Sequence, residues 1–163
     1  MPPLLRSALL WIALVSAARP AAAGTDVWTS LDPYGGRIQA LATDPDDPGT
    51  LYAGTGTSGV WKSRDGGKRW VAAREGLGPG SLSIYALAVA PGPEGAVYAG
   101  TATGLFKTTD GGSTWQPVAL QMPASSAVIS LAVNPADPAE IWAGNGKEIW
   151  HTEDGGQTRP ARF

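Results

Sequence analysis

The octapeptide SRDGGKRW, residues Ser63–Trp70, returns as TTDGGSTW over Thr108–Trp115 and in altered form as TEDGGQTR over Thr152–Arg159. Counted from the aspartate of each copy to the next, the spacings are 45 and 44 residues. A period of this length, kept through three copies, indicates a repeat architecture before any other residue is considered.

The repeated motif has the chemistry of a tight turn. An aspartate side chain accepts hydrogen bonds from nearby backbone N–H groups, adjacent glycines permit positive φ, and a Ser or Thr hydroxyl adds a second local bond. The closing tryptophan supplies a large apolar body that can pack under the turn. We therefore interpret the repeated aspartates as structural, not catalytic. The predicted turn residues are Ser63, Asp65, Gly67, Trp70, Thr108, Asp110, Gly112, Trp115, Thr152, Asp154 and Gly156.

The sequence around the motif repeats as well. Each unit holds an alternating run, a short run ending in YAG or WAG, and a third run centred on an aromatic residue, and in two units a fourth run begins at the tryptophan. Four short strands separated by small-residue turns, without a 3.6-residue period, predict an antiparallel four-stranded sheet. A radial array of such sheets is a β-propeller, with blades of about 40 to 50 residues. The predicted fold class is all-β, with about three blades' worth of sequence.

The repeats also predict the boundaries of the blades. Residues 37–75 and 83–120 are expected to form two blades of four strands, named A to D from the inner edge outward. Residues 127–163 are expected to form an incomplete blade without strand D, because Arg159 stands where the tryptophan should be. Residues 26–31 read as an outer D strand that has no A, B and C strands of its own.

Three blades are too few for a closed ring, because known propellers use about 4 to 8. Open sheet edges would then be exposed to other strands. Three accounts remain: a truncated or frameshifted gene product, a fragment whose missing blades lie elsewhere, or self-association of two three-blade halves into a six-blade ring. The change from TEDGGQT to RPARF after Thr158 favours the first account.

The S/T-x-D-x-G-x-x-W signature resembles the Asp box, or BNR repeat, of sialidases, sortilin ectodomains, xyloglucanases and photosystem II assembly factor propellers. The whole repeat, with its DP-x-DP, YAGT and aromatic-K-S/T-x-DGG segments, is most similar to bacterial BNR-like and sortilin-like propellers. The resemblance covers nearly everything after residue 25. It implies a fold and not an activity, because this family is functionally mixed.

The N-terminal segment is of another kind. Arg6 precedes an apolar stretch, Ala8–Ala18, and the small residues Ala21–Ala23 satisfy the cleavage rule of a secretory signal. The length of this stretch fits a retained membrane anchor less well, because a membrane-spanning helix needs about 20 apolar residues. We predict a signal peptide over residues 1–23, a mature partial propeller over 24–163, a secreted or periplasmic location, and no membrane association after cleavage.

The composition of the chain bears on which partners, cofactors and metals are expected. The chain has 12 basic and 14 acidic residues, and it shows no basic stripe, so nucleic acid is not an expected partner. It contains no cysteine, so its stability does not come from disulfides. No cofactor is predicted. No metal site is predicted either, because the single histidine, His151, reads as a surface residue of strand C and has no cysteine to complete a usual zinc site.

The resemblance to glycosidases raises the question of catalysis. A glycoside hydrolase needs two carboxylates about 5 to 9.5 Å apart. The D-to-A and B-to-C loops share the end of the blades where propellers usually bind ligands, and there Asp32 is a clear carboxylate and Glu148 lies at the edge. Xyloglucanases carry an Asp between strands B and C, where this chain has Thr55, Thr57 and Ser58. The arginine triad of sialidases has no match, and no catalytic residue is predicted.

The best candidates for ligand contact at that end are Tyr34, Arg37, Gln39 and Tyr85. The predicted function is that of a secreted, non-catalytic propeller module that binds a protein or a glycan, as a scaffold or assembly factor. The alternative is a remnant of a secreted xyloglucanase-like or sialidase-like glycoside hydrolase whose catalytic carboxylates lie in blades that this chain lacks. The sequence names no individual ligand.

Overall fold

The structure is a computed structural model that describes residues 36–92, 95–119, 126–157 and 161–162. Every described residue belongs to one compact unit, Leu31–Phe163. The predicted signal peptide 1–23, the predicted strand 26–31 and Tyr34 lie outside the described residues.

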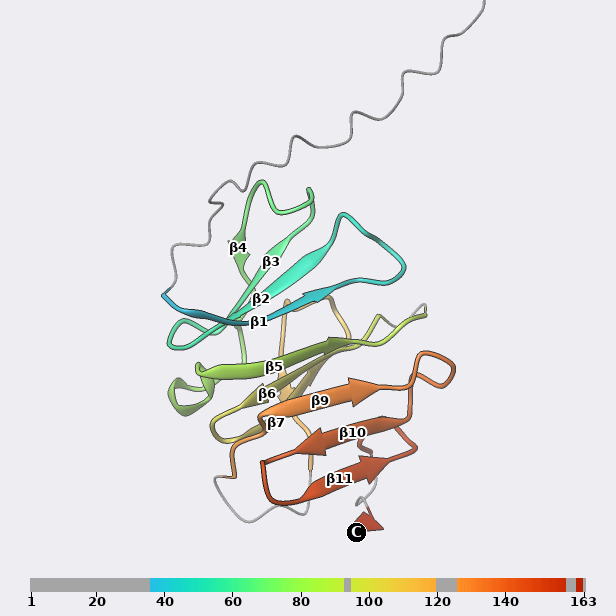
Figure 1. Ribbon diagram of the computed structural model, residues 1–163. Coiled ribbons are helices and arrows are strands. Elements are labelled where there is room, and N and C mark those ends of the chain that lie inside the picture. Colours follow the sequence, from blue (N-terminus) through green and yellow to red (C-terminus); the bar gives the residue numbers. More distant parts are fainter. Residues whose placement is uncertain (1–35, 93–94, 120–125, 158–160, 163) are drawn as a thin grey trace, which may run out of the picture. The chain divides into compact units, whose positions relative to one another are not determined.

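Three four-stranded antiparallel sheets make up the described part of the chain, each with its strands in sequence order (Figure 1). The first blade consists of β1 (Ile38–Thr43), β2 (Leu51–Thr55), β3 (Val60–Ser63) and β4 (Val71–Ala72). The second consists of β5 (Ile84–Val89), β6 (Val97–Thr101), β7 (Gly104–Thr108) and β8 (Gln116–Pro117). The third consists of β9 (Ser130–Val133), β10 (Ile141–Gly144), β11 (Ile149–Thr152) and β12 (Ala161–Arg162).

These sheets are blades of an incomplete β-propeller, and the fold is all-β. The one helical element described is the 3₁₀ turn η1 (Pro79–Ser81), between the first and second blades. Within the described residues, no helix is long and apolar enough to cross a membrane.

The third blade has a strand that the sequence did not predict. We expected it to lack strand D, yet β12 pairs with β11 through Trp150↔Arg162 and His151↔Ala161. Strand pairing uses backbone N–H and C=O groups, which every non-proline residue carries. A short outer strand therefore forms without the tryptophan that precedes β4 and β8.

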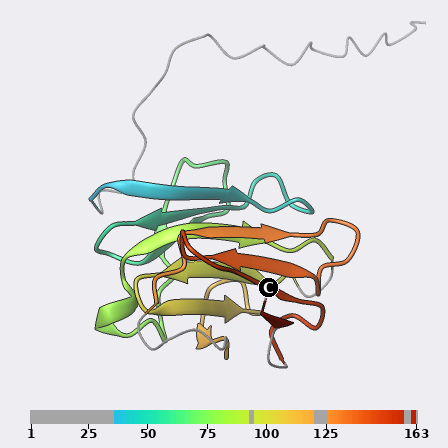
Figure 2. The ribbon, with the colours of Figure 1, turned by 60° about the horizontal axis from the view of Figure 1, so that its bottom comes forward.

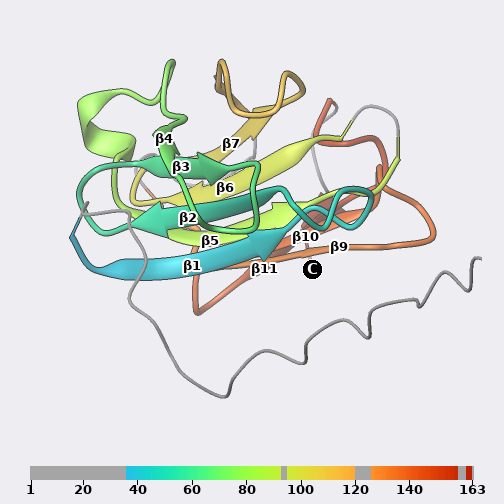
Figure 3. The same ribbon diagram turned by 90° about the horizontal axis from the view of Figure 1, so that it is seen from above.

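The inner strands of neighbouring blades lie next to one another. β1 contacts β5, and β5 contacts β9, and the three arrows point the same way (Figure 2). Figure 3 shows β1 and β5 on one side of the sheets and β4 and β7 on the other. The apolar cores consequently lie at the joints between blades. The first joint has a core of Tyr52, Val60, Ala73, Leu77, Ile84, Val97, Ala99 and Trp115, and the second has Ala90, Ala96, Tyr98, Leu105, Val128, Ile141 and Ala143.

Both joints are built on the same close contact. A Cβ atom added to Gly54 would lie 2.5 Å from Cγ2 of Ile84, and one added to Gly100 would lie 2.5 Å from the carbonyl oxygen of Val128. Ile84 and Val128 are both fully buried, with 0% exposure. Ile38, which holds the same position in the first blade, is 39% exposed. Each glycine therefore admits a side chain or backbone atom of the following blade.

Hydrogen bonds assign the connecting loops to two ends of the blades. We call the end with the β1–β2 and β3–β4 connections and their counterparts the turn end, because Gly66 N there donates to Gly49 O at 3.0 Å. The opposite end, with the β2–β3 and β4–β5 connections, is the loop end. There Gly59 N donates to Leu82 O at 2.9 Å. The DGG motifs lie at the turn end.

Candidate functional site

The DGG turn of the second blade is closed by hydrogen bonds between its own residues. The Thr108 hydroxyl donates to Asp110 Oδ1 at 2.7 Å and accepts from Gly112 N at 3.0 Å. Asp110 Oδ1 also accepts from Thr114 N at 2.8 Å, and its Oδ2 accepts from the Thr114 hydroxyl at 2.6 Å. Gly111 and Gly112 have φ of 69° and 90°, in the region that favours glycine.

The other two turns contain the same central contacts. Ser63 Oγ donates to Asp65 Oδ1 at 2.9 Å, and Thr152 Oγ1 donates to Asp154 Oδ1 at 2.6 Å. In each turn the amide of the second glycine donates to that hydroxyl, at 2.9 and 3.3 Å. Asp154 Oδ1 further accepts from Gln157 N at 3.0 Å. The carboxylates at these positions are thus engaged by the turn.

The same hydrogen bonds favour the ionised form of the aspartates. The backbone amide of Arg69 is the largest cause that lowers the pKa of Asp65 below its ordinary value. For Asp110, the hydroxyls of Thr114 and then Thr108 hold the pKa well below the usual range. A carboxylate that accepts several hydrogen bonds releases its proton easily and is a poor general acid.

The tryptophan that ends the motif packs differently from the expectation. The sequence placed it under its own turn, whereas Trp115, which is 3% exposed, belongs to the core of the first joint. Its Nε1 donates to Ala73 O at 2.8 Å and its backbone N donates to Glu75 O at 2.8 Å. The indole thereby links the second blade to the first. Trp70, its counterpart in the first blade, is half-buried.

Lys62 of the first blade, beside Tyr52, binds the DGG turn of the second blade. Lys62 Nζ donates to Gly111 O at 2.8 Å and lies 5.1 Å from the centre of the Tyr52 ring, within cation–π distance. Burial lowers the pKa of Lys62. In the second blade, Lys107 lies 5.5 Å from the ring centre of Tyr98. Lys62 and Lys107 were not among the residues predicted from the sequence, although each directly precedes the Ser or Thr of a DGG motif.

Three clefts lie at the turn end. The one at the first joint has a volume of about 450 Å³ and is lined by Lys62, Arg64, Arg69 and Asp65, among others. Two further clefts of about 310 and 360 Å³ adjoin the turn around Gly155. We expected ligand contacts at the opposite end. Arg64 and Arg69, which belong to the first DGG motif, line the cleft at the first joint.

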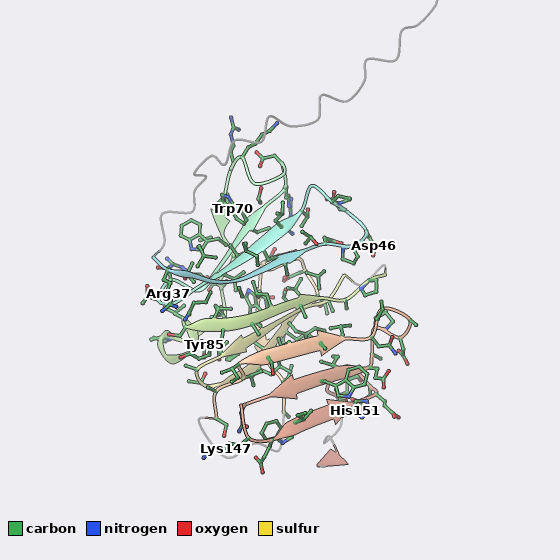
Figure 4. All side chains as sticks on the ribbon, viewed as in Figure 1. Arg37, Asp46, Trp70, Tyr85, Lys147 and His151 are labelled. Carbon is green, nitrogen blue, oxygen red and sulfur yellow. The ribbon has the colours of Figure 1, made fainter. Side chains whose placement is uncertain are left out.

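The predicted ligand residues that are described lie at the loop end. Arg37 and Gln39 are exposed at the start of β1, and Tyr85 is half-buried on β5. Figure 4 shows Arg37 and Tyr85 on the side opposite Asp46 and His151. The Arg37 carbonyl accepts from Gly56 N at 2.9 Å.

Loops from neighbouring blades are joined at this end. Ser83 Oγ donates to Gly56 O at 2.8 Å, and Ser81 Oγ and Thr103 Oγ1 are 2.6 Å apart. In the described parts of segments 56–59, 78–83, 101–103, 126–127 and 145–148, Glu148 is the one carboxylate. Glu75 lies in the β4–β5 connection as well, so the described loop-end connections carry one carboxylate between the first and second blades and one, Glu148, in the third blade.

A second group of polar side chains lies at the turn end of the third blade. Glu140, His151 and Glu153 have potential metal-ligand atoms that all lie within 4.8 Å of one another. His151 Nε2 is 3.0 Å from Glu140 Oε1, and the imidazole stacks on Trp142 with ring centres 4.8 Å apart. From the sequence, His151 was expected to be a surface residue and no metal ligand was predicted; Glu153 is two residues away, whereas Glu140 is 11 positions away and comes close only through the pairing of β10 with β11.

No protein-family model matches the chain, and no curated protein matches it. Solved structures do. An ancestral GH74 enzyme has a TM-score of 0.69 at 24% identity, over 85% of this chain and 20% of that one. YCF48 from Cyanidioschyzon merolae has a TM-score of 0.60 at 17% identity, over 80% of this chain and 38% of that one. An auxiliary nutrient binding protein from Bacteroides thetaiotaomicron has a TM-score of 0.59 at 12% identity, over 79% of this chain and 30% of that one.

These likenesses establish the β-propeller fold. The identities are all below 25%, and the chain spans between 20% and 38% of the length of these three structures. Their names are those of a GH74 enzyme, of YCF48 and of an auxiliary nutrient binding protein. Proteins with this blade architecture thus differ in function, so the function of this chain has to be inferred from its own residues.

Proposed function

We propose that this chain is a propeller module of the Asp-box type that binds a protein or a glycan at its loop end and catalyses no reaction. The observation that supports this function best is the character of the loop end itself. Loops of adjacent blades are joined there by hydrogen bonds, and the described carboxylates of these connections, Glu75 and Glu148, belong to the β4–β5 and β10–β11 connections, which lie in different blades. A rigid set of loops suits recognition, whereas glycoside hydrolysis requires two carboxylates about 5 to 9.5 Å apart on one sugar.

The Asp-box assignment has its own support. In all three turns a Ser or Thr hydroxyl donates to the aspartate two residues later and accepts from the glycine amide four residues later. This pattern accounts for the S/T-x-D-x-G spacing of the motif, because each of the three residues contributes one partner. Secretion is supported by the sequence of residues 1–23 alone.

Arg37, Gln39 and Tyr85 are the proposed contacts. A guanidinium, an amide and an aromatic ring at the same end of neighbouring blades can provide hydrogen bonds and a stacking surface, which glycans and protein loops both use. The nutrient-binding protein among the fold neighbours is consistent with a binding role.

Binding and catalysis can be separated in one experiment. The purified chain is titrated calorimetrically with a xyloglucan heptasaccharide and with 3′-sialyllactose, and both mixtures are assayed for released sugar. We expect binding of one probe without product, weakened about fivefold or more by Arg37→Ala, the effect of losing roughly 1 kcal/mol at a contact. Arg69→Ala, at the turn end, is the matched control and should bind normally.

The alternative function predicts another result. A remnant glycoside hydrolase would release sugar from one of the probes, and that outcome would overturn the non-catalytic proposal. Equal loss of binding in Arg37→Ala and Arg69→Ala would contradict the loop end as the binding surface. If neither glycan binds, a protein ligand remains, and the same two variants are compared in cross-linking of the chain to culture-supernatant proteins; retained cross-linking by Arg37→Ala would then exclude the loop end.

A further inference from the structure

We propose that Glu140, His151 and Glu153 form a binding site for a divalent transition-metal ion of the Zn²⁺ class at the turn end of the third blade. Their ligand atoms lie within 4.8 Å of one another, so small side-chain movements bring them around one ion. His151 Nε2 already lies 3.0 Å from Glu140 Oε1. Ligands of a tetrahedral ion lie about 2.0 to 2.2 Å from the metal, so a spacing near 3 Å between two of them fits.

The repeat provides an internal comparison. Cross-strand pairs Leu51↔Ser63, Val97↔Thr108 and Ile141↔Thr152 align the three blades. The residues that flank these pairs can therefore be compared position by position. The three positions are Thr50, Lys62 and Arg64 in the first blade, Ala96, Lys107 and Thr109 in the second, and Glu140, His151 and Glu153 in the third.

All three positions change together in the third blade. In the first two blades they hold cations and groups that ligate metals weakly or not at all, and Lys62 there binds the following blade's turn. In the third blade every one of them is a carboxylate or an imidazole. A general surface preference for acidic residues would not explain the histidine at the position of the two lysines.

Neighbouring groups orient the proposed ligands. Asn134 Nδ2 donates to Glu140 Oε2 at 2.5 Å, and Trp142 stacks on the imidazole with an angle of 21° between the rings. The side chains of His151 and Glu140 are 14% and 23% exposed, so they are held in place but reachable from solvent. Groups that hold a metal-ligating side chain in one orientation raise the affinity of the site for its metal.

The donor set selects the kind of ion. One imidazole and two carboxylates suit Zn²⁺ and similar ions, with water as the remaining ligand. Ca²⁺ prefers six to eight oxygen ligands, which this group does not offer.

The test uses the tag-free full chain and ZnCl₂ alone, measured by calorimetry, with Co²⁺ absorption spectra as a second readout. We expect one ion per chain, and affinity at least about tenfold weaker in His151→Lys and in Glu153→Thr, each of which restores a residue of another blade. Glu75→Gln, a carboxylate change in another part of the chain, is the control. It should bind as the unaltered chain does.

Three results would overturn the proposal, two from Zn²⁺ calorimetry and one from the Co²⁺ spectra. The first is absence of Zn²⁺ binding by the folded, unaltered chain, and the second is unchanged affinity in both site variants. Far-UV circular dichroism checks that each variant folds. Glu153 is exposed, so Glu153→Thr decides the matter even where the histidine variant does not fold. A Co²⁺ spectrum that keeps its imidazole ligation in His151→Lys would equally exclude this site.

Discussion

The Thr108 hydroxyl makes three hydrogen bonds within the DGG turn, as many as the Asp110 carboxylate. Thr108 is 2% exposed, and its hydroxyl donates to Asp110 and accepts from Gly112 N and, at 3.3 Å, from Asp110 N. A buried amide left without an acceptor costs free energy, because water cannot replace the lost partner. The serine or threonine of the motif is therefore as important as its aspartate.

Thr108→Val tests this role, since valine keeps the shape and removes the hydroxyl. We expect the free energy of unfolding to fall by about 1 to 3 kcal/mol, the cost of an unsatisfied buried group. Urea denaturation followed by tryptophan fluorescence measures it. Thr109→Val, next to it and exposed, is the control and should change stability little. Equal effects in the two variants would contradict the assignment.

Asp110 makes stability depend on pH. Its pKa is lowered in the folded chain by the Thr114 and Thr108 hydroxyls, and the value in an unfolded chain is about 3.9. The folded state therefore binds fewer protons, and its extra stability is present above pH about 4 and is lost as the pH falls toward the folded pKa. Melting temperatures measured from pH 6 to acid should fall less steeply for Asp110→Asn than for the unaltered chain. Parallel curves would show that Asp110 does not contribute.

At the scale of strands and sheets, neighbouring blades are held together by side-chain contacts between one sheet and the next. The Trp115 indole, the Lys62 ammonium and the fit of Val128 against Gly100 all join neighbouring blades. The third blade's extra strand β12 belongs to this scale too, because backbone pairing formed it where the side-chain pattern had ended.

Gly100→Ala tests the joint between the second and third blades. Its Cβ would lie 2.5 Å from Val128 O and 2.9 Å from Val128 Cγ1, so the blades must move apart. Overpacking of this kind costs about 1 to 3 kcal/mol in the free energy of unfolding. Gly78→Ala is the matched control, because nothing lies within 4 Å of its Cβ position. We expect thermal denaturation to show a loss for Gly100→Ala and no loss for Gly78→Ala.

At the scale of the whole molecule, we propose that the first and third described blades hold complementary halves of one joint; Ser130 Oγ, which lies 2.5 Å from the Cβ position of Gly144, would turn aside there. Ile38 is 39% exposed where Ile84 and Val128 are buried, and Gly144 takes the place of Gly54 and Gly100. We propose that a second copy of the chain supplies the missing half, head to tail. Two copies would then make a ring of six blades, within the usual range of about 4 to 8.

Sedimentation velocity tests this association. We expect a dimer that Ile38→Asp dissociates, because a charge at the joint would lose its hydration. Val71→Asp changes a side chain that is 62% exposed on an outer strand and should leave the dimer intact. A monomer at all concentrations, or a dimer unaffected by Ile38→Asp, would contradict the proposal.

The all-β class and the antiparallel four-stranded sheets followed from the sequence, except for β12. These features depend on local periodicity and on hydrogen bonds between residues up to four positions apart, such as Thr108 and Gly112. The direction in which Trp115 packs did not follow, because a large apolar side chain can pack on either side of its strand.

The sequence by itself determined an all-β chain of repeated four-stranded units, because strand alternation and turn chemistry repeat at a constant spacing. Only the tertiary structure decided which residues meet between units: Lys62 and Gly111 are 49 positions apart, and Glu140 and His151 are 11 apart on neighbouring parts of one sheet. Such contacts depend on how sheets stack and on strand register, which local patterns do not specify. For that reason the turns could be predicted, while the clefts and the Glu–His–Glu group could not.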